Sequence, residues 1–197
     1  MGTILQSLGK TVIAGFVLLV LIILVVGAAT GSMTTVNHAW SMFFVRWLHV
    51  LSGVMWIGLL WYFNFVQIPS MPKIPDEQKP AIGKVIAPTA LFWFRWAALS
   101  TVVTGVLLAS MSGYIVQALM FSRPFVAIGI GMWMGLVMAY NVWFIIWPNQ
   151  KKALGMVQVE PAEKAAAARL AMLTSRVNTL LSIPMLYCMV AQQNGGL

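Results

Sequence analysis

The feature that most constrains this chain is its long apolar runs. Residues 11–29 read TVIAGFVLLVLIILVVGAA and contain no charged side chain. About 20 apolar residues of helix are enough to cross a hydrocarbon core of about 30 Å. The strands of a membrane barrel would instead alternate apolar and polar residues. The run therefore predicts a membrane-spanning helix.

The composition supports a membrane protein. Of 197 residues, 60% are apolar and 8% are charged, whereas a soluble domain carries about 25% charged residues. A soluble globule could not cover its surface with so few charges. One cysteine, Cys188, allows no intrachain disulfide and no CxxC cluster. We therefore expect an all-α, polytopic integral membrane helical bundle.

The apolar stretches predict five transmembrane helices within a single membrane domain, residues 1–197. The first stretch resembles a signal-peptide core preceded by Lys10, but its length favours a helix that is retained. The loops between the stretches are too short to fold as separate domains. The predicted spans cover residues 11–29, 40–67, 91–117, 124–147 and 173–191.

Two connecting loops have a distinctive composition. Residues 67–88 read QIPSMPKIPDEQKPAIGKVIAP and contain five prolines. Repeated proline opposes a helix and favours extended structure at the surface. In the second loop, residues 160–176 predict a short helix that begins near Pro161 and leads into the last span.

The net charge of +8 predicts how the chain is inserted. Ten of the twelve basic residues fall on one side of the predicted spans: Lys10, the basic residues of 73–95 and those of 151–176. The other side has only Arg46 and Arg123. The positive-inside rule then places the N-terminus in the cytoplasm and the C-terminus in the periplasm, across a bacterial inner membrane. The charge implies contact with membrane lipids, and no nucleic-acid partner.

The two histidines are the main candidates for chemistry, because no acid lies in any predicted span. A carboxylate proton relay or a carboxylate diiron site is therefore not expected. His38 and His49 are eleven residues apart, which is about 16 Å of rise on a continuous helix. His38 would lie near the outer surface and His49 well inside. They could not then bind one iron from opposite sides. We expect His49 to face the bundle interior and not lipid, because an ionisable side chain at that depth needs a polar or metal partner. Asn141, another polar residue in a predicted span, is expected to form a hydrogen bond across helices.

A b-type haem would need such residues, because haem iron accepts His with His, or His with Met. His49 is the candidate metal ligand, and His38 could serve a second haem. Gly53, one turn from His49, would leave room for a flat ring. Arg95 and Arg176 could hold haem propionates or a substrate carboxylate. Three plainer roles stay open: a histidine bonded to a neighbouring helix, an interfacial histidine, and arginines that reach the lipid headgroups.

Four stretches resemble, in order, the N-terminal membrane domain of the membrane-bound urate hydroxylase (urate oxidase, PuuD-type) family. The strings RWLHV and WPNQKK are the most specific. The resemblance implies a redox membrane protein. Members typically continue into a cytochrome c domain with a CxxCH haem attachment, and this chain has no CxxCH. We therefore expect electrons to pass to a separate cytochrome c. The stretches are residues 46–67, 92–108, 141–155 and 176–190.

A more distant similarity connects the chain to HemJ-type protoporphyrinogen oxidases, which hold haem b through a histidine. It rests on the pattern WLHV…W-x-G, residues 47–58, and on R-V-x-x-L, residues 176–180, with a later proline. His49 falls on the matching position. This similarity implies haem b at His49 but does not carry the activity over.

Two functions of different classes follow. In the first, the chain is a redox protein in which His49 ligates a b-type haem. In the second, it is a non-catalytic accessory subunit of a larger respiratory or oxygenase complex. The sequence has no GxSxG, P-loop or HExxH motif, so it identifies neither a substrate nor a catalytic residue.

Overall fold

The computed structural model describes residues 2–32 and 34–196, and every regular element in those residues is a helix. This confirms the all-α class. The chain divides into two compact units, Met1–Ser41 and Met42–Leu197.

The first unit contains a short helix, α1 (Gly2–Leu5), and a long one, α2 (Leu8–Thr30). Helix α2 ends because Gly31 adopts the left-handed conformation, with φ of 66°, and its N–H bonds to the carbonyl of Gly27. Apart from Gly27, the side chains of α2 are exposed or half-buried. A helix that is apolar on all sides is suited to a lipid environment. The first predicted span is therefore a helix of the expected length.

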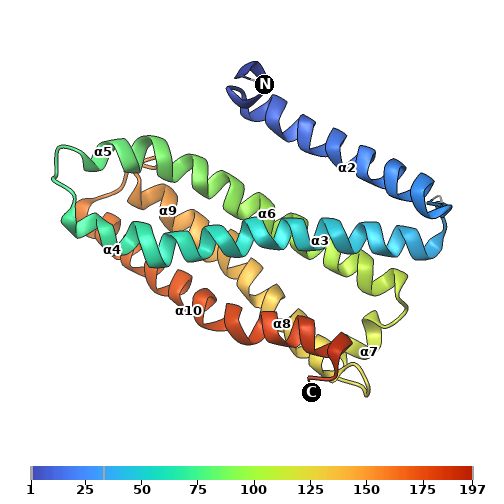
Figure 1. Ribbon diagram of the computed structural model, residues 1–197. Helices are drawn as coiled ribbons and strands as arrows, with labels where there is room; N and C mark the ends of the chain where they lie inside the picture. The colour runs from blue at the N-terminus through green and yellow to red at the C-terminus, as the bar shows by residue number, and fades with distance from the viewer. Residues whose placement is uncertain (1, 33, 197) are drawn as a thin grey trace. The chain divides into compact units, whose positions relative to one another are not determined.

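The second unit consists of four helical rods, and α3 (His38–Trp61) leads into it. The rods are held together by α10, which packs along α8, η4 and α9 and also contacts η1. Helix α6 packs on α8 and η4. The buried core between the rods includes Trp56, Leu60, Phe94 and Met138. Figure 1 shows the rods and their connections. The elements after α3 are η1 (Tyr62–Gln67), α4 (Ile68–Ser70), η2 (Met71–Lys73), α5 (Lys79–Ala81), η3 (Ile82–Ile86), α6 (Ala87–Met111), α7 (Ile115–Leu119), α8 (Val126–Tyr140), η4 (Asn141–Ile146), α9 (Trp147–Ala153) and α10 (Pro161–Asn194).

Three of the rods contain a π-helical segment, η1, η3 or η4, and each segment ends two residues before a proline. The prolines are Pro69, Pro88 and Pro148. Proline has no N–H to donate, and its ring clashes with the carbonyl four residues earlier. In all three rods that carbonyl lies inside the π segment. A wider turn relieves the clash, so the rod continues through the proline instead of ending there.

This finding corrects the prediction for residues 67–88. We expected extended structure there, but only residues 74–78 are non-helical. Pro72 and Pro80 lie at the first positions of short helical pieces, where proline costs no hydrogen bond. In the remaining turn Lys79 forms an ion pair with Asp76 at 2.5 Å. The hydrogen bond and the charge of Lys79 lower the pKa of Asp76.

Four helical segments in the described residues are long and apolar enough to cross a membrane: Leu8–Thr30, His38–Lys73, Lys79–Met111 and Val126–Ala153. The chain is thus a multi-pass membrane protein by this criterion. The predicted fifth span, residues 173–191, lies in α10, which is not in this set. Helix α10 is long enough to cross a membrane, but its polar residues lower its mean hydropathy. Five spans are therefore not confirmed.

The polar residues of α10 cross-link the bundle. Asn141 Nδ2 donates to Asn178 Oδ1 at 2.8 Å, and Asn178 Nδ2 donates to the carbonyl of Met138 at 2.9 Å. The predicted bond from Asn141 to another helix is confirmed. Asn64 on η1 donates in the same way to Ser175 at 2.8 Å. These bonds explain why α10 carries polar side chains on its buried face.

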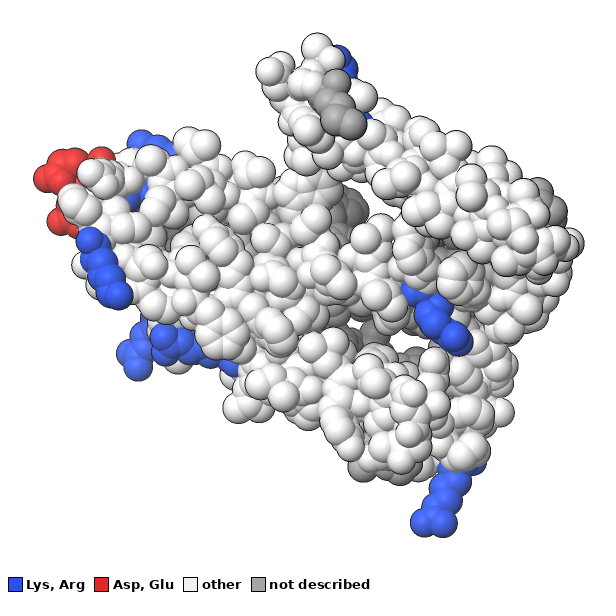
Figure 2. Space-filling model, viewed as in Figure 1, with Lys and Arg blue, Asp and Glu red and all other residues white. Residues whose placement is uncertain are grey.

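Charged side chains gather at one end of the second unit. Figure 2 shows blue and red side chains at the end where α4 and α5 lie in Figure 1, while most of the visible surface is uncharged. Asp76 and Glu77 lie in the turn between η2 and α5. Lys73 is the last residue of the rod before this turn, and Lys79 is the first residue of the rod after it. Charged residues at one end of a helical bundle are typical of the level at which a membrane protein meets the lipid headgroups.

The amide of Asn178 should contribute measurably to stability. Asn178→Ala removes the acceptor of Asn141 Nδ2 and one of the donors to the Met138 carbonyl in an apolar interior. We expect the free energy of unfolding in detergent to fall by about 1 kcal/mol. Gln193→Ala, at an exposed position of the same helix, should change it far less. Equal effects of the two substitutions would contradict a role for the amide pair.

Candidate functional site

The imidazole of His49 faces α6. Its Nδ1 lies 2.9 Å from the backbone carbonyl oxygen of Thr101 and 3.3 Å from Thr104 Oγ1. A carbonyl oxygen can only accept, so Nδ1 carries the proton and donates it. In the neutral ring, Nε2 then carries the lone pair. As we expected, His49 packs against a neighbouring helix rather than pointing away from the bundle.

A glycine on α6 allows this close approach. A Cβ atom placed on Gly105 would lie 2.8 Å from Cε1 and 3.2 Å from Nδ1 of His49. Any other residue at position 105 would push the ring away from the Thr101 carbonyl. Gly53, predicted to leave room for a flat ring, faces the same helix. Its own added Cβ would lie 3.9 Å from Thr101 Cγ2.

This arrangement suits a histidine that would bind a haem iron through Nε2. Histidines that bind metals usually donate the other ring N–H to a carbonyl or a carboxylate, which fixes the tautomer and the orientation of the ring. His49 does this through Thr101. Its Nε2 makes no hydrogen bond within residues 2–32 and 34–196. Among those residues, no three His, Cys, Asp or Glu side chains cluster as a metal site. A metal at His49 would therefore not be held by a cluster of such side chains.

The other predicted site residues lie apart from His49. His38 is exposed at the start of α3, which runs unbroken to Trp61. Arg95 on α6 lies over the ring of Trp147, with its Cζ 3.5 Å from the ring centroid. Arg176 is exposed on α10. No hydrogen bond, ion pair or ring contact joins the two arginines in the described part of the chain.

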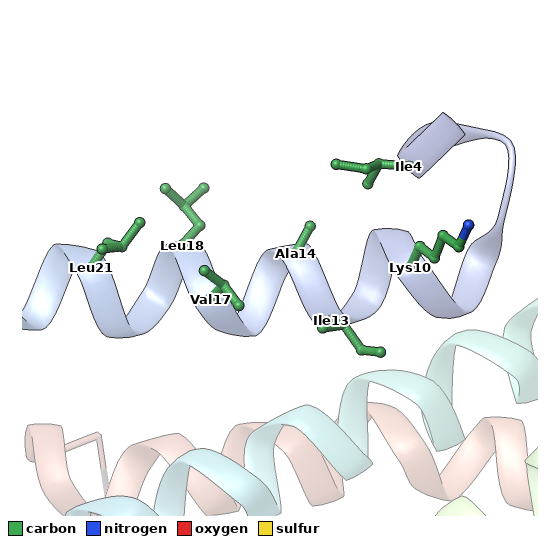
Figure 3. Close-up of a pocket in the computed structure, with 7 residues that line it drawn as sticks. All are labelled: Ile4, Lys10, Ile13, Ala14, Val17, Leu18 and Leu21. Atoms are coloured by element: carbon green, nitrogen blue, oxygen red, sulfur yellow. The ribbon is translucent and has the colours of Figure 1, made fainter. Parts of the chain in front are cut away.

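Two surface depressions in the described residues are lined mostly by apolar side chains. One, in the first unit, is lined by Lys10 and otherwise by apolar side chains of α1 and α2, and Figure 3 shows these side chains. The other lies between α6 and α8–η4. It is also apolar, with Tyr140 and Trp143 as its polar-tipped members. Both suit contact with lipid chains rather than catalysis.

The pKa of one titratable group, Tyr114, is shifted. Tyr114, between α6 and α7, stacks on Phe125 with ring centroids 5.0 Å apart. Burial raises the pKa of Tyr114, and the positive charge of Arg46 partly opposes this rise. The raised pKa keeps the phenol neutral, and its ring acts as a stacking group.

Sequence reasoning missed the α6 side of the site. Thr101, Thr104 and Gly105 form the pattern TxxTG within an apolar run. The two threonines also bond to carbonyls of their own helix, Ala97 and Ser100. The sequence does contain one signal of a close helix contact here, a small residue one helical turn after a threonine. That signal could not show which helix would lie opposite.

Comparison with known families concerns the C-terminal half of this bundle. Residues 111–195 match the family model described as urate oxidase N-terminal. This segment matches the urate oxidase N-terminal family. The resemblance predicted from WPNQKK and from residues 176–190 is thus confirmed there. No curated protein and no solved structure was found to match the chain.

The urate oxidase N-terminal match begins at the last residue of α6 and extends through α10. It includes the Asn141–Asn178 pair and the Trp147 ring. His49, Arg95 and Gly105 lie before it. The family match therefore supports the resemblance of residues 111–195 to that family, while the evidence at His49 comes from its own contacts.

Gly105 should be intolerant of a side chain because of His49. We expect Gly105→Ala to lower the free energy of unfolding by about 1–3 kcal/mol, the usual range for overpacking. Gly58→Ala is the matched control, since an added Cβ there meets nothing within 4 Å, and it should be neutral or stabilising.

The cause can be isolated with a double mutant. In a His49→Ala background the clash is gone, so Gly105→Ala should cost much less than in the natural chain. Thermal unfolding of the four proteins in detergent measures this coupling. A cost that stays the same in both backgrounds would mean that position 105 does not contact His49.

Proposed function

We propose that this protein is a urate oxidase-related redox component of the bacterial inner membrane in which His49 ligates a b-type haem. The observation that carries the proposal is the 2.9 Å hydrogen bond from His49 Nδ1 to the Thr101 carbonyl. It directs the proton to Nδ1 and leaves Nε2 available for a metal.

The surrounding residues have defined tasks in this proposal. Thr101 fixes the tautomer and orientation of the imidazole, and the Thr104 hydroxyl adds a second acceptor at 3.3 Å. Gly105 lets the ring approach α6. A haem bound at His49 would supply one-electron transfer. The residues of this chain would hold the ligand at fixed orientation inside an apolar bundle that excludes water.

The orientation of the chain determines where electrons would leave. We place the N-terminus in the cytoplasm and the C-terminus in the periplasm, on the basis of the ten-to-two distribution of basic residues. The electron acceptor is then a separate cytochrome c at the periplasmic face. The charged end seen in Figure 2 would face the cytoplasm.

A topology measurement tests this orientation. A reporter enzyme that is active only in the periplasm, fused after Leu197, should be active, and the same reporter inserted in residues 74–78 should be inactive. The reason is the attraction of basic residues to the cytoplasmic side. Activity of the reporter inserted in residues 74–78, with none after Leu197, would reverse the orientation.

Haem ligation can be tested by comparing the two histidines. Reduced-minus-oxidised spectra of the purified protein should show a b-type band that His49→Ala abolishes. His38→Ala is the matched control and should retain haem, because about 16 Å of helix separates the two positions. Thermal unfolding of both variants confirms that the fold survives. Equal loss of haem in both variants, with the fold intact, would contradict the proposal.

The alternative is a non-catalytic accessory subunit of a larger respiratory or oxygenase complex. One observation favours it: the hydrogen bond to Thr101 satisfies His49 inside the bundle without any cofactor. The same spectra distinguish the two functions. Wild-type protein purified without a b-type band, even after haem is supplied, would support the accessory role.

A further inference from the structure

Most of the basic side chains have no carboxylate partner among the residues that the structure describes. The chain has twelve basic residues and four acids. The two ion pairs in the described residues join Lys79 to Asp76 and Lys152 to Glu163. Arg95 and Lys151 form no ion pair there, although both lie in the bundle at half-buried positions. Both side chains are therefore open to an anion other than a carboxylate of the described residues.

Arg95 is held in place by aromatic side chains. Its Cζ lies 3.5 Å from the centroid of the Trp147 ring and 5.9 Å from that of Phe92. The indole N–H of Trp143 donates to the Arg95 backbone carbonyl at 3.2 Å, which ties α6 to η4 at this level. The guanidinium is therefore stacked and oriented. Its Nη1 is buried and has no hydrogen-bond partner in the described chain.

Lys151 shares the same aromatic ring. It follows Trp147 by four residues on α9, which places both side chains on one face of that helix. Its Nζ lies 5.7 Å from the Trp147 ring centroid. Two cations thus approach one indole, and neither forms an ion pair with a carboxylate in the described residues. Like charges repel, and a bound anion would reduce that repulsion.

We propose that Arg95, Trp147 and Lys151 form a binding site for the phosphate of an anionic phospholipid. The planar guanidinium offers paired N–H donors that match phosphate oxygens, and the ammonium adds a point charge. Tryptophan is the residue that most favours the level of the headgroups. The site lies on α6 and α9, and α9 leads to the charged end of the bundle shown in Figure 2. Membrane leaflets supply anionic headgroups at this level.

The experiment compares lipids on the purified full chain in a zwitterionic detergent. Dioleoylphosphatidylglycerol, dioleoylphosphatidylcholine and inorganic phosphate are added in separate titrations, and the unfolding midpoint is followed. The anionic lipid should raise the midpoint saturably, with the other two adding little. Native mass spectrometry should show one phosphatidylglycerol retained in preference to phosphatidylcholine.

Neighbouring lysines provide the matched variants. Lys151→Gln should weaken the apparent affinity for phosphatidylglycerol about fivefold, the effect of one basic residue at a membrane surface. Lys152→Gln removes the same charge one residue away, from a side chain paired with Glu163 at 2.7 Å, and should leave the affinity nearly unchanged. Lys151→Arg keeps the charge and should restore binding. This last variant shows that the loss comes from the charge rather than from a disturbed fold.

Three results would overturn the proposal. Equal stabilisation by the anionic and the zwitterionic lipid would show that no headgroup is recognised. Equal weakening by Lys151→Gln and Lys152→Gln would indicate a diffuse surface charge instead of a site. Saturable stabilisation by inorganic phosphate alone, as strong as that by the lipid, would assign the site to a soluble anion. The haem spectra above do not enter this test, so its failure and the failure of the proposed function are separate results.

Discussion

A polar group inside a bilayer has no water to bond with, and this constraint organises the second unit of the protein. Several of its interior polar side chains are bonded from one rod to another. His49 joins α3 to α6, Asn64 joins η1 to α10, and Asn141 joins η4 to α10. Each bond satisfies a group that would otherwise be costly, and each also fixes the relative position of two rods. Packing alone would leave apolar helices free to slide, because lipid tails are as apolar as the core.

The bond at His49 shows how one contact can serve both structure and chemistry. As a structural contact it satisfies the ring and ties two rods together. As a chemical one it decides which nitrogen carries the proton. A histidine buried for stability and a histidine prepared for a metal therefore have the same immediate surroundings here. Only the presence of a ligand at Nε2 separates the two roles, which is why spectra rather than further geometry decide between them.

Sequence patterns predicted the local features of this fold well. The apolar runs predicted the rods, Pro161 marked the start of α10, and the polar Asn141 predicted a bond across helices. Long-range features were not predictable in this way. Thr101 and Gly105 are more than 50 residues from His49, and no local pattern indicates which helices become neighbours. The pairing of Arg95 with Trp147 depends in the same way on how α6 meets η4 and α9. The prediction of extended structure in the proline-rich segment was wrong for a different reason. The steric clash that each proline causes is local, and a π-helical turn just before the proline can relieve it.

The π-helical segments have a consequence for the angular order of side chains. A wider turn holds an extra residue, which shifts the helical phase of everything after it by about 100° relative to a regular helix. The face of α8 that meets α10 and the face of α9 that carries Trp147 and Lys151 therefore do not lie on one continuous stripe. A helical wheel drawn across residues 126–153 would mix the two faces and hide both. Deleting a single residue from η4 would remove the wide turn and leave Trp147 facing Arg95, because the deleted residue is the one that the wide turn had absorbed. A regular helical wheel would then describe the whole rod.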